Sequence, residues 1–230
     1  MKTVQLLVLT VFWCGLVFAE EPEVFYCNGP KNTKMISITF DDGPGPYTEK
    51  ILGVLKSYGI KATFFMEGSQ VQMRPALAKL VADEGHEIGG HSYSHPDFYH
   101  YEKDDREQLL LQEFQKTDSL IERATGRRPL LVRMPHGYVR PWVKKTARDT
   151  GHILVNWTFG CDWKPLSPED IAAAYGTNIR SGAIFLMHDG GRNRARTLDA
   201  LPKIIEEAQS RGYAIVPLGT LLGLEATTTK

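Results

Sequence analysis

Carboxylates and imidazoles follow short apolar segments at several points of this 230-residue sequence. Asp41 and Asp42 come directly after one such segment and before Gly43-Pro44. Adjacent carboxylates repel each other, so a cation or a strong hydrogen-bond donor must hold them in place. His91 and His95 are four residues apart and can present two nitrogens to one metal ion. Together with a carboxylate they would form the two-histidine, one-carboxylate set that leaves coordination positions open for water and substrate.

Three further segments carry residues of the same kind. Arg133 begins the string Arg-Met-Pro-His-Gly-Tyr, Asp162 precedes Trp163, and His188 ends the string Leu-Met-His. Taken singly, each segment has a structural alternative: an acidic turn, a buried arginine, a carboxylate at a strand end or a core histidine. All five segments, however, end a predicted strand, and an α/β barrel collects its active-site groups at that edge.

The elements that must position these residues alternate along the chain. Apolar, β-branched runs predict strands at Met35–Phe40, Ala62–Met66, Glu87–Gly89, Pro129–Arg133, Ile153–Phe159, Ala183–Met187 and Ala214–Pro217. Helical periodicity predicts helices at Thr48–Tyr58, Pro75–Glu84, Asp104–Thr125, Trp142–Thr150, Pro168–Ile179 and around 198–208. This alternation favours one domain with a mainly parallel sheet, either closed as a barrel or open and doubly wound.

Charge is balanced, with 27 basic and 27 acidic side chains. A neutral chain gives no electrostatic footprint for nucleic acid or an anionic membrane, so neither is an expected partner. A neutral sugar polymer fits this composition better.

The first 19 residues have the pattern of an export signal: a lysine, an apolar run too short to span a bilayer comfortably, and a small-residue cleavage site at Ala19. We therefore expect a signal peptide at 1–19, an N-terminal extension at 20–34 and a polar tail at 223–230. The mature chain is then secreted, extracellular or in the cell wall, without stable membrane insertion. Its two cysteines, Cys27 and Cys161, are either bridged in this oxidising setting or separate buried thiols.

The order of the five segments resembles the polysaccharide deacetylase family of carbohydrate esterases, which includes chitin and peptidoglycan N-deacetylases. The strings are Thr-Phe-Asp-Asp-Gly-Pro, His-Ser-Tyr-Ser-His, Arg-Met-Pro-His-Gly-Tyr, Asp-Trp and Leu-Met-His-Asp, and the resemblance covers residues 35–222. It implies a single catalytic domain with a distorted (β/α) barrel of about seven parallel strands, fewer than the eight of the regular form. It also implies one divalent metal ion, with zinc as the first expectation and cobalt as the alternative.

The resemblance also implies roles for individual residues. Asp42, His91 and His95 would bind the metal. Asp41 would be the general base, held ionised by Arg133. The general acid would be His188, held protonated by Asp162. The residues expected to bind substrate are Pro135, His136, Gly137, Tyr138, Trp163 and Leu186.

Three positions depart from the family pattern. Met134 replaces a small residue or proline, His136 replaces an aromatic residue, and Phe159 replaces an aspartate. These changes leave the metal and acid–base residues intact. The function expected is metal-dependent removal of N-acetyl groups from a chitin-like polymer of N-acetylglucosamine. The alternatives are the same reaction on peptidoglycan or another acetylated glycan, and a secreted carbohydrate-binding protein with weak or no turnover.

Overall fold

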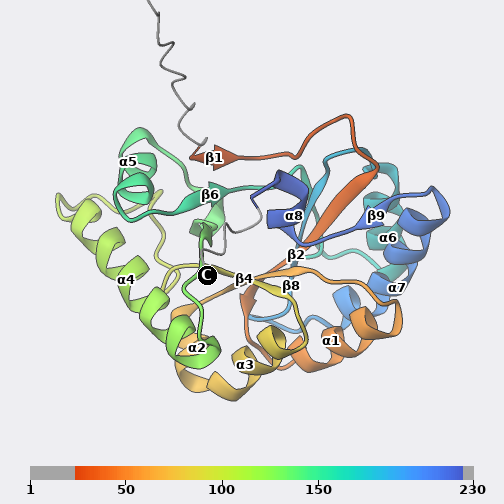
Figure 1. Cartoon of the computed structure of the whole chain (residues 1–230), viewed down its shortest axis with the longest axis horizontal. Helices are drawn as coiled ribbons and strands as arrows, with labels where there is room; N and C mark the ends of the chain where they lie inside the picture. The colour runs from red at the N-terminus through yellow and green to blue at the C-terminus, as the bar shows by residue number, and fades with distance from the viewer. Residues whose placement is uncertain (1–23, 225–230) are drawn as a thin grey trace, which may run out of the picture.

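The computed structural model describes residues 24–224, and one parallel sheet forms the centre of that part of the chain (Figure 1). The sheet has nine strands. Their bounds are β1 Phe25–Tyr26, β2 Met35–Gly43, β3 Thr63–Met66, β4 Glu87–Gly90, β5 Leu131–Val132, β6 Ile153–Val155, β7 Phe159–Gly160, β8 Ile184–His188 and β9 Ala214–Ile215.

The strand order explains how distant sequence segments meet. It runs β1-β6-β5-β4-β3-β2-β8-β7, with β9 paired to β2 beside this path. Every pairing among these strands is parallel. Asp41 is therefore in register with Phe65 of β3 on one side and with His188 of β8 on the other. The carboxyl ends of the strands form one edge, and the sheet curls into the distorted (β/α) barrel that the sequence predicts.

Helices cover the outer face of the curved sheet (Figure 1). Their bounds are α1 Thr48–Ser57, α2 Gly68–Met73, α3 Pro75–Asp83, α4 Arg106–Thr125, α5 Pro141–Asp149, α6 Pro168–Thr177, α7 Ala195–Ser210 and α8 Leu218–Leu222, with a 3₁₀ turn at Pro135–Gly137. Local chemistry sets some of these ends. The hydroxyl of Ser167 accepts the N–H of Asp170 at the start of α6, and Gly126 ends α4 at φ 76°.

The core lies between the sheet and these helices. Ile36, Ile38 and Phe40 of β2 are fully buried in the largest apolar cluster, which also contains residues of α1 and α7. Burying a side chain of this size contributes about 1.5–3 kcal/mol. The longest strand is thus anchored in the core directly before Asp41 and Asp42, which rigidly sets the position of both carboxylates.

The predicted elements agree with the structure except in detail. The strand predicted at Ile153–Phe159 is two strands, β6 and β7, because the N–H of Thr158 turns to the carbonyl of Ile184 on β8. β1 is an additional strand within the predicted N-terminal extension at 20–34. The predicted signal peptide at 1–19 and residues 225–230 of the predicted tail lie outside the described residues. In the described part, no helix is long and apolar enough to span a membrane.

The bridge considered between Cys27 and Cys161 does not form, and both residues are free thiols in the structure. Cys27 follows β1 at one end of the strand order, whereas Cys161 follows β7 at the other end. Cys27 is exposed and Cys161 packs in the main core. Burial, together with the charge of Asp162, raises the pKa of the Cys161 thiol to about 11.

The difference in burial predicts that the two cysteines react differently with a thiol reagent at pH 8 in the absence of reductant. Because only the thiolate reacts, exposed Cys27 should react in the native protein and Cys161 only after unfolding. Cys27→Ser should therefore lower the native thiol count by one, and Cys161→Ser should lower only the count in denaturant. A disulfide would be indicated by a native thiol count that Cys27→Ser leaves unchanged.

Candidate metal and catalytic site

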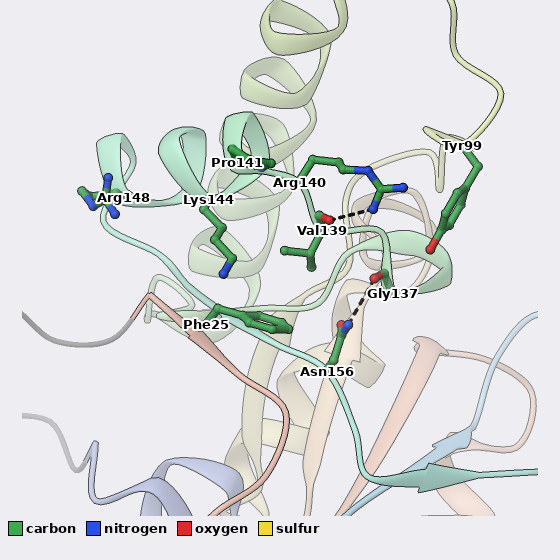
Figure 2. Close-up of a pocket in the computed structure, with 9 residues that line it drawn as sticks. All are labelled: Phe25, Tyr99, Gly137, Val139, Arg140, Pro141, Lys144, Arg148 and Asn156. Atoms are coloured by element: carbon green, nitrogen blue, oxygen red, sulfur yellow. Dashed lines mark hydrogen bonds between the residues drawn. The ribbon is translucent and has the colours of Figure 1, made fainter.

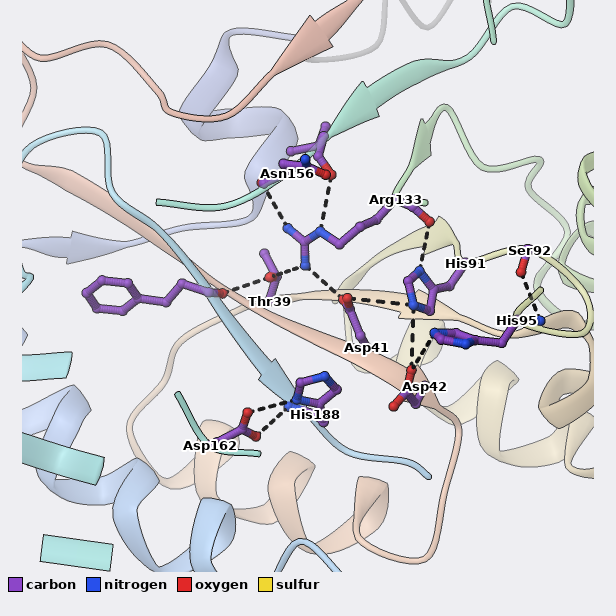
Figure 3. Close-up of polar contacts among 12 residues, drawn as sticks. Thr39, Asp41, Asp42, His91, Ser92, His95, Arg133, Asn156, Asp162 and His188 are labelled. Carbon is purple, nitrogen blue, oxygen red and sulfur yellow. Dashed lines mark hydrogen bonds and ion pairs between the residues drawn. The ribbon is translucent and has the colours of Figure 1, made fainter. Parts of the chain in front are cut away.

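Asp42, His91 and His95 converge at the carboxyl edge of the sheet (Figure 3). The Nε2 atoms of His91 and His95 lie 3.5 and 3.7 Å from Oδ1 of Asp42. The three ligand atoms lie within 4.8 Å of one another, so a single cation can contact all of them. Two imidazoles and one carboxylate are a donor set that suits zinc and leaves coordination positions open. The residues present therefore fit one divalent metal ion.

The protonation states of this cluster also suit metal binding. Burial opposes ionisation of Asp42, but His91, through a hydrogen bond and its charge, keeps the pKa of that carboxyl well below its usual range. Burial and the neighbouring charge of His91 lower the pKa of His95 to about 4. Burial acts in the same direction on His91, but Asp41 and Asp42 outweigh it and raise its pKa. The raised pKa of His91 means that protons compete with a metal ion for its ring nitrogen, so metal affinity falls as pH falls.

The loop that carries both histidines is held by a carboxylate from outside the motifs. Oε2 of Glu113 on α4 accepts the N–H groups of Tyr93 and Ser94 at 2.7 Å each, and Oε1 accepts the Ser94 hydroxyl at 2.8 Å. Ser92 Oγ accepts the N–H of His95 at 3.1 Å. In addition, Nδ1 of His91 is 2.7 Å from the carbonyl of Arg133, which orients the ring so that Nε2 faces Asp42.

Arg133 lies under Asp41 and is completely buried. Its Nη1 donates to Oδ1 of Asp41 at 2.8 Å and to the hydroxyl of Thr39 at 2.7 Å. Nε and Nη2 donate to the carbonyls of Val155 and Asn156 at 3.2 Å each. Burial lowers the pKa of the Arg133 guanidinium, and the charge of Asp41 opposes that shift. The ion pair holds Asp41 in one orientation at the edge of the metal cluster.

His188 lies on the other side of Asp41 from Arg133 (Figure 3). Its ring Nδ1 is 2.8 Å from Oδ1 of Asp162. Oδ2 of Asp162 accepts hydrogen bonds from the backbone N–H of His188 and from the Thr197 hydroxyl, at 2.9 Å each. Burial opposes protonation of His188, but the hydrogen bond and charge of Asp162, with Asp41 and Asp42, raise its pKa. His188 is thus disposed to carry a proton on the side of the imidazole that faces the pocket.

A pocket of about 370 Å³ joins these groups. It is lined by Asp41, Asp42, His91, His95, Met134, His136, Gly137, Trp157, Trp163, Leu186 and His188. Two carboxylates and four imidazoles of the predicted set thus meet around one small, partly apolar space. Its size and lining suit an acetamide group on a sugar, with Leu186 and the tryptophan rings facing the apolar parts.

The structure brings most of the predicted site residues together. Arg133 and Asp162 lie behind the pocket wall, each bonded to a residue that lines it. Pro135 and Tyr138 do not line the pocket: Pro135 is buried at the start of the 3₁₀ turn, and Tyr138 packs in a separate apolar cluster. The roles assigned to single residues stay predictions.

Sequence reasoning missed two positions that the structure makes prominent. Trp157 lines the pocket two residues after the end of β6, a strand-end position like that of the five motifs. Glu113 is 94% buried, on the same face of α4 as Leu110 and Phe114. A carboxylate on the apolar stripe of an amphipathic helix is a signal that could have identified it, because such a group must find donors.

Comparisons with known proteins agree with this geometry. Residues 28–155 match the family described as Polysaccharide deacetylase. The chain is 40% identical over 197 residues to a peptidoglycan-N-acetylglucosamine deacetylase of Bacillus cereus, covering 84% of this chain and 90% of that protein. The structure is similar to that of the Bc1960 peptidoglycan N-acetylglucosamine deacetylase, with a TM-score of 0.82, 32% identity and coverage of 87% and 94%. It is also similar to BA3943, a CE4 family pseudoenzyme from Bacillus anthracis, with a TM-score of 0.80, 32% identity and coverage of 87% and 69%.

The ligand geometry predicts that His95→Ala no longer retains a metal ion after dialysis. Removing one of three protein ligands should weaken binding by more than the roughly 10- to 100-fold that follows loss of an outer-shell partner. His100→Ala is the matched control, because His100 is exposed and pairs with Asp97 away from the cluster. Metal content and thermal stability should be measured together. Equal metal content in both variants would contradict the assignment.

Proposed function

This chain belongs to the polysaccharide deacetylase family of amide-hydrolysing enzymes, and we propose that it removes N-acetyl groups from N-acetylglucosamine units of a glycan polymer. The observation that carries the proposal is the pairing of Asp41 with Arg133 and of His188 with Asp162 around the same small pocket. One pair suits a base and the other suits an acid, which is what hydrolysis of an amide needs. The products are acetate and a free amino sugar.

Asp42, His91 and His95 would hold the metal ion, for which we propose zinc, with cobalt as the alternative. Such a cation makes a water molecule more acidic and polarises the amide carbonyl. The protein keeps Asp42 ionised and points the Nε2 atoms of His91 and His95 toward that carboxylate. For His91, the contact between Nδ1 and the carbonyl of Arg133 sets this ring orientation.

Asp41 is positioned to take the proton of the attacking water. The Arg133 guanidinium, 2.8 Å from Oδ1, holds the carboxylate in one orientation and leaves Oδ2 toward the pocket. On the opposite side, His188 donates a proton to the departing nitrogen, because an amine leaves poorly unless it is protonated. Asp162 stabilises the imidazolium before that transfer and keeps the ring oriented.

The turn at His136 supplies a donor for the oxygen of the substrate amide. The N–H groups of Gly137 and Tyr138 donate to the carbonyls of Met134 and Pro135, which fixes the turn. His136 has φ 56°, so its peptide is held in a left-handed conformation at the pocket. We propose that its backbone N–H faces the developing oxyanion. A backbone donor makes this step independent of the change from an aromatic residue to His136.

The sequence alone favoured a chitin-like polymer and kept peptidoglycan as an alternative. Two similar proteins are named as peptidoglycan N-acetylglucosamine deacetylases, which moves our proposal toward peptidoglycan. A cell-wall polymer lies outside the cytoplasm, and the predicted export signal at 1–19 fits that substrate. We therefore propose a secreted or cell-wall location.

A second candidate function is binding without turnover. It is favoured by the similarity to a pseudoenzyme of the same family, together with the departures at Met134, His136 and Phe159. Against it stands the complete set of base, acid and metal-binding side chains in one pocket. Acetate release separates the two candidates.

The proposal predicts metal-dependent release of acetate from N-acetylglucosamine oligomers or peptidoglycan strands. Asp41→Asn should retain the metal and lose about 10²- to 10⁴-fold in kcat, the usual contribution of a general base. Asp83→Asn is the control, since Asp83 forms an exposed ion pair with Lys79. Binding of oligomers without acetate release, with zinc or cobalt restored, would favour the binding protein.

The His188–Asp162 pair predicts a change in the pH dependence of kcat/KM. His188 acts as an acid only while protonated, so activity is lost as pH rises through its pKa. Asp162 raises that pKa, and Asp162→Asn should therefore move the basic limb of the profile to lower pH. Asp149→Asn, a surface change, should leave the limb in place. An unmoved limb in Asp162→Asn would remove His188 from the role of acid.

A further inference from the structure

A second pocket, of about 650 Å³, lies beside the catalytic pocket, and Figure 2 shows the residues that line it. Gly137 lines both pockets. Asn156 lines the second pocket, and its neighbour Trp157 lines the first. Nδ2 of Asn156 donates to the Gly137 carbonyl at 3.1 Å and fixes the wall between them. The two pockets are therefore neighbours that meet at Gly137.

The second pocket has a basic lining. Arg140, Lys144 and Arg148 contribute to it, and no acidic residue does. Lys144 and Arg148, four residues apart, lie on one side of α5, and Arg140 is the residue directly before that helix. Among the described residues, none of the three forms an ion pair with a carboxylate. By contrast, Lys145 on the same helix pairs with Asp149 at 2.5 Å.

Aromatic rings hold two of these cations at the pocket. Nζ of Lys144 lies 4.7 Å from the centre of the Phe25 ring. The guanidinium of Arg140 lies 4.9 Å from the ring of Tyr138 and 5.8 Å from that of Tyr99. Cation–π contacts orient a side chain without neutralising its charge. The Tyr99 side chain is also half exposed, so part of its ring stays open to a sugar.

Overall charge does not account for this concentration of cations. Basic and acidic residues number 27 each, so a concave surface with three unpaired cations is a local feature. Its connection to the catalytic pocket through Gly137 favours the glycan itself as the ligand over an unrelated anion. An anion that repeats along the glycan would meet the basic side chains whenever the neighbouring acetamide is in place.

We propose that Phe25, Tyr99, Arg140, Lys144 and Arg148, here called the basic pocket, bind a carboxylate carried by the glycan beside the sugar that is deacetylated. The inference rests on the proposed function and specifies its substrate class: an acidic N-acetylated glycan, in preference to a neutral one. The carboxylate has two chemical sources, an acidic ether substituent on the sugar or a peptide attached to that substituent.

The test compares oligomers of equal length in kcat and KM for acetate release, and in equilibrium binding. One is a neutral N-acetylglucosamine oligomer. The second alternates N-acetylglucosamine with a sugar that carries a lactyl carboxylate, the third has those carboxylates converted to amides, and the fourth carries peptides on them. The variants are the double change Arg140→Gln and Lys144→Gln, with Lys145→Gln as the matched control on the same helix.

We expect the double variant to raise KM for the acidic oligomer about tenfold at low salt, as loss of a charge-assisted contact predicts, with kcat unchanged. The neutral and amidated oligomers should respond to neither variant, and Lys145→Gln should change nothing. Added salt should reduce the preference, because exposed charges are screened. The peptide-free acidic oligomer and the peptide-bearing oligomer distinguish the two sources of the carboxylate.

The outcomes separate the two proposals. The proposal of the basic pocket would be overturned by equal KM values for the acidic and amidated oligomers that do not change in the double variant. Acetate release in the same experiment would still support the proposed function. Charge-dependent binding that the double variant abolishes, without acetate release from any oligomer, would support the basic pocket and overturn the proposed function.

Discussion

The ion pair between Arg133 and Asp41 is the interaction on which the site depends. Arg133 is fully buried, and its donors reach β2 through Thr39 and Asp41 and the end of β6 through Val155 and Asn156. A buried guanidinium is costly unless every donor is used, and breaking such a pair by removing one partner costs about 3–5 kcal/mol. The same contacts that satisfy the arginine therefore tie two distant strands together and hold the proposed base in one orientation. Stability and chemistry are coupled at this position.

Local backbone strain is concentrated in the same place. Among the described residues, the non-glycine residues with positive φ are Asp42, Ser92, His95 and His136. Such conformations cost about 1–3 kcal/mol each and persist only where the surroundings enforce them. Asp42 and His95 are proposed metal ligands, Ser92 bonds to the His95 N–H, and His136 forms the turn at the pocket. A close approach of Gly190 to the Asp42 carbonyl, where any side chain would collide, helps to enforce the first of these.

Much of this arrangement could be predicted from sequence because it follows from strand ends. Parallel strands place their carboxyl ends at one edge, so apolar runs followed by Asp41, His91, Arg133 and His188 predict a shared site. The break between β6 and β7 could not be predicted, since it depends on Thr158 changing its pairing partner in space. The separation of Cys27 and Cys161 likewise depends on strand order, which periodicity does not contain. Glu113 was missed because its partners are backbone N–H groups of a distant loop.

The net charge of the chain likewise says little about how charged side chains are grouped on its surface. A net charge of zero favoured a neutral polymer, yet α5 and the residue before it gather cations without carboxylate partners in a pocket next to the catalytic one. The composition of the whole chain limits only its long-range field, whereas a ligand meets the few side chains within a Debye length, about 8–10 Å at ordinary ionic strength. Arguments from net charge therefore exclude partners that cover large surfaces, such as nucleic acid, more reliably than they identify a small ligand.

Similarity of fold does not show whether a protein of this family turns over its substrate. A peptidoglycan deacetylase and a pseudoenzyme of the family are similar to this chain to almost the same degree, with TM-scores of 0.82 and 0.80 and 32% identity in both cases. The backbone therefore cannot distinguish an enzyme from a binding protein, because both need the same barrel to present a glycan groove. What distinguishes them is whether a base and an acid are positioned to face one acetamide from opposite sides. Here Arg133 holds Asp41 in place on one side, and Asp162 favours the imidazolium of His188 on the other; these two pairs, more than the barrel, are the argument for catalysis.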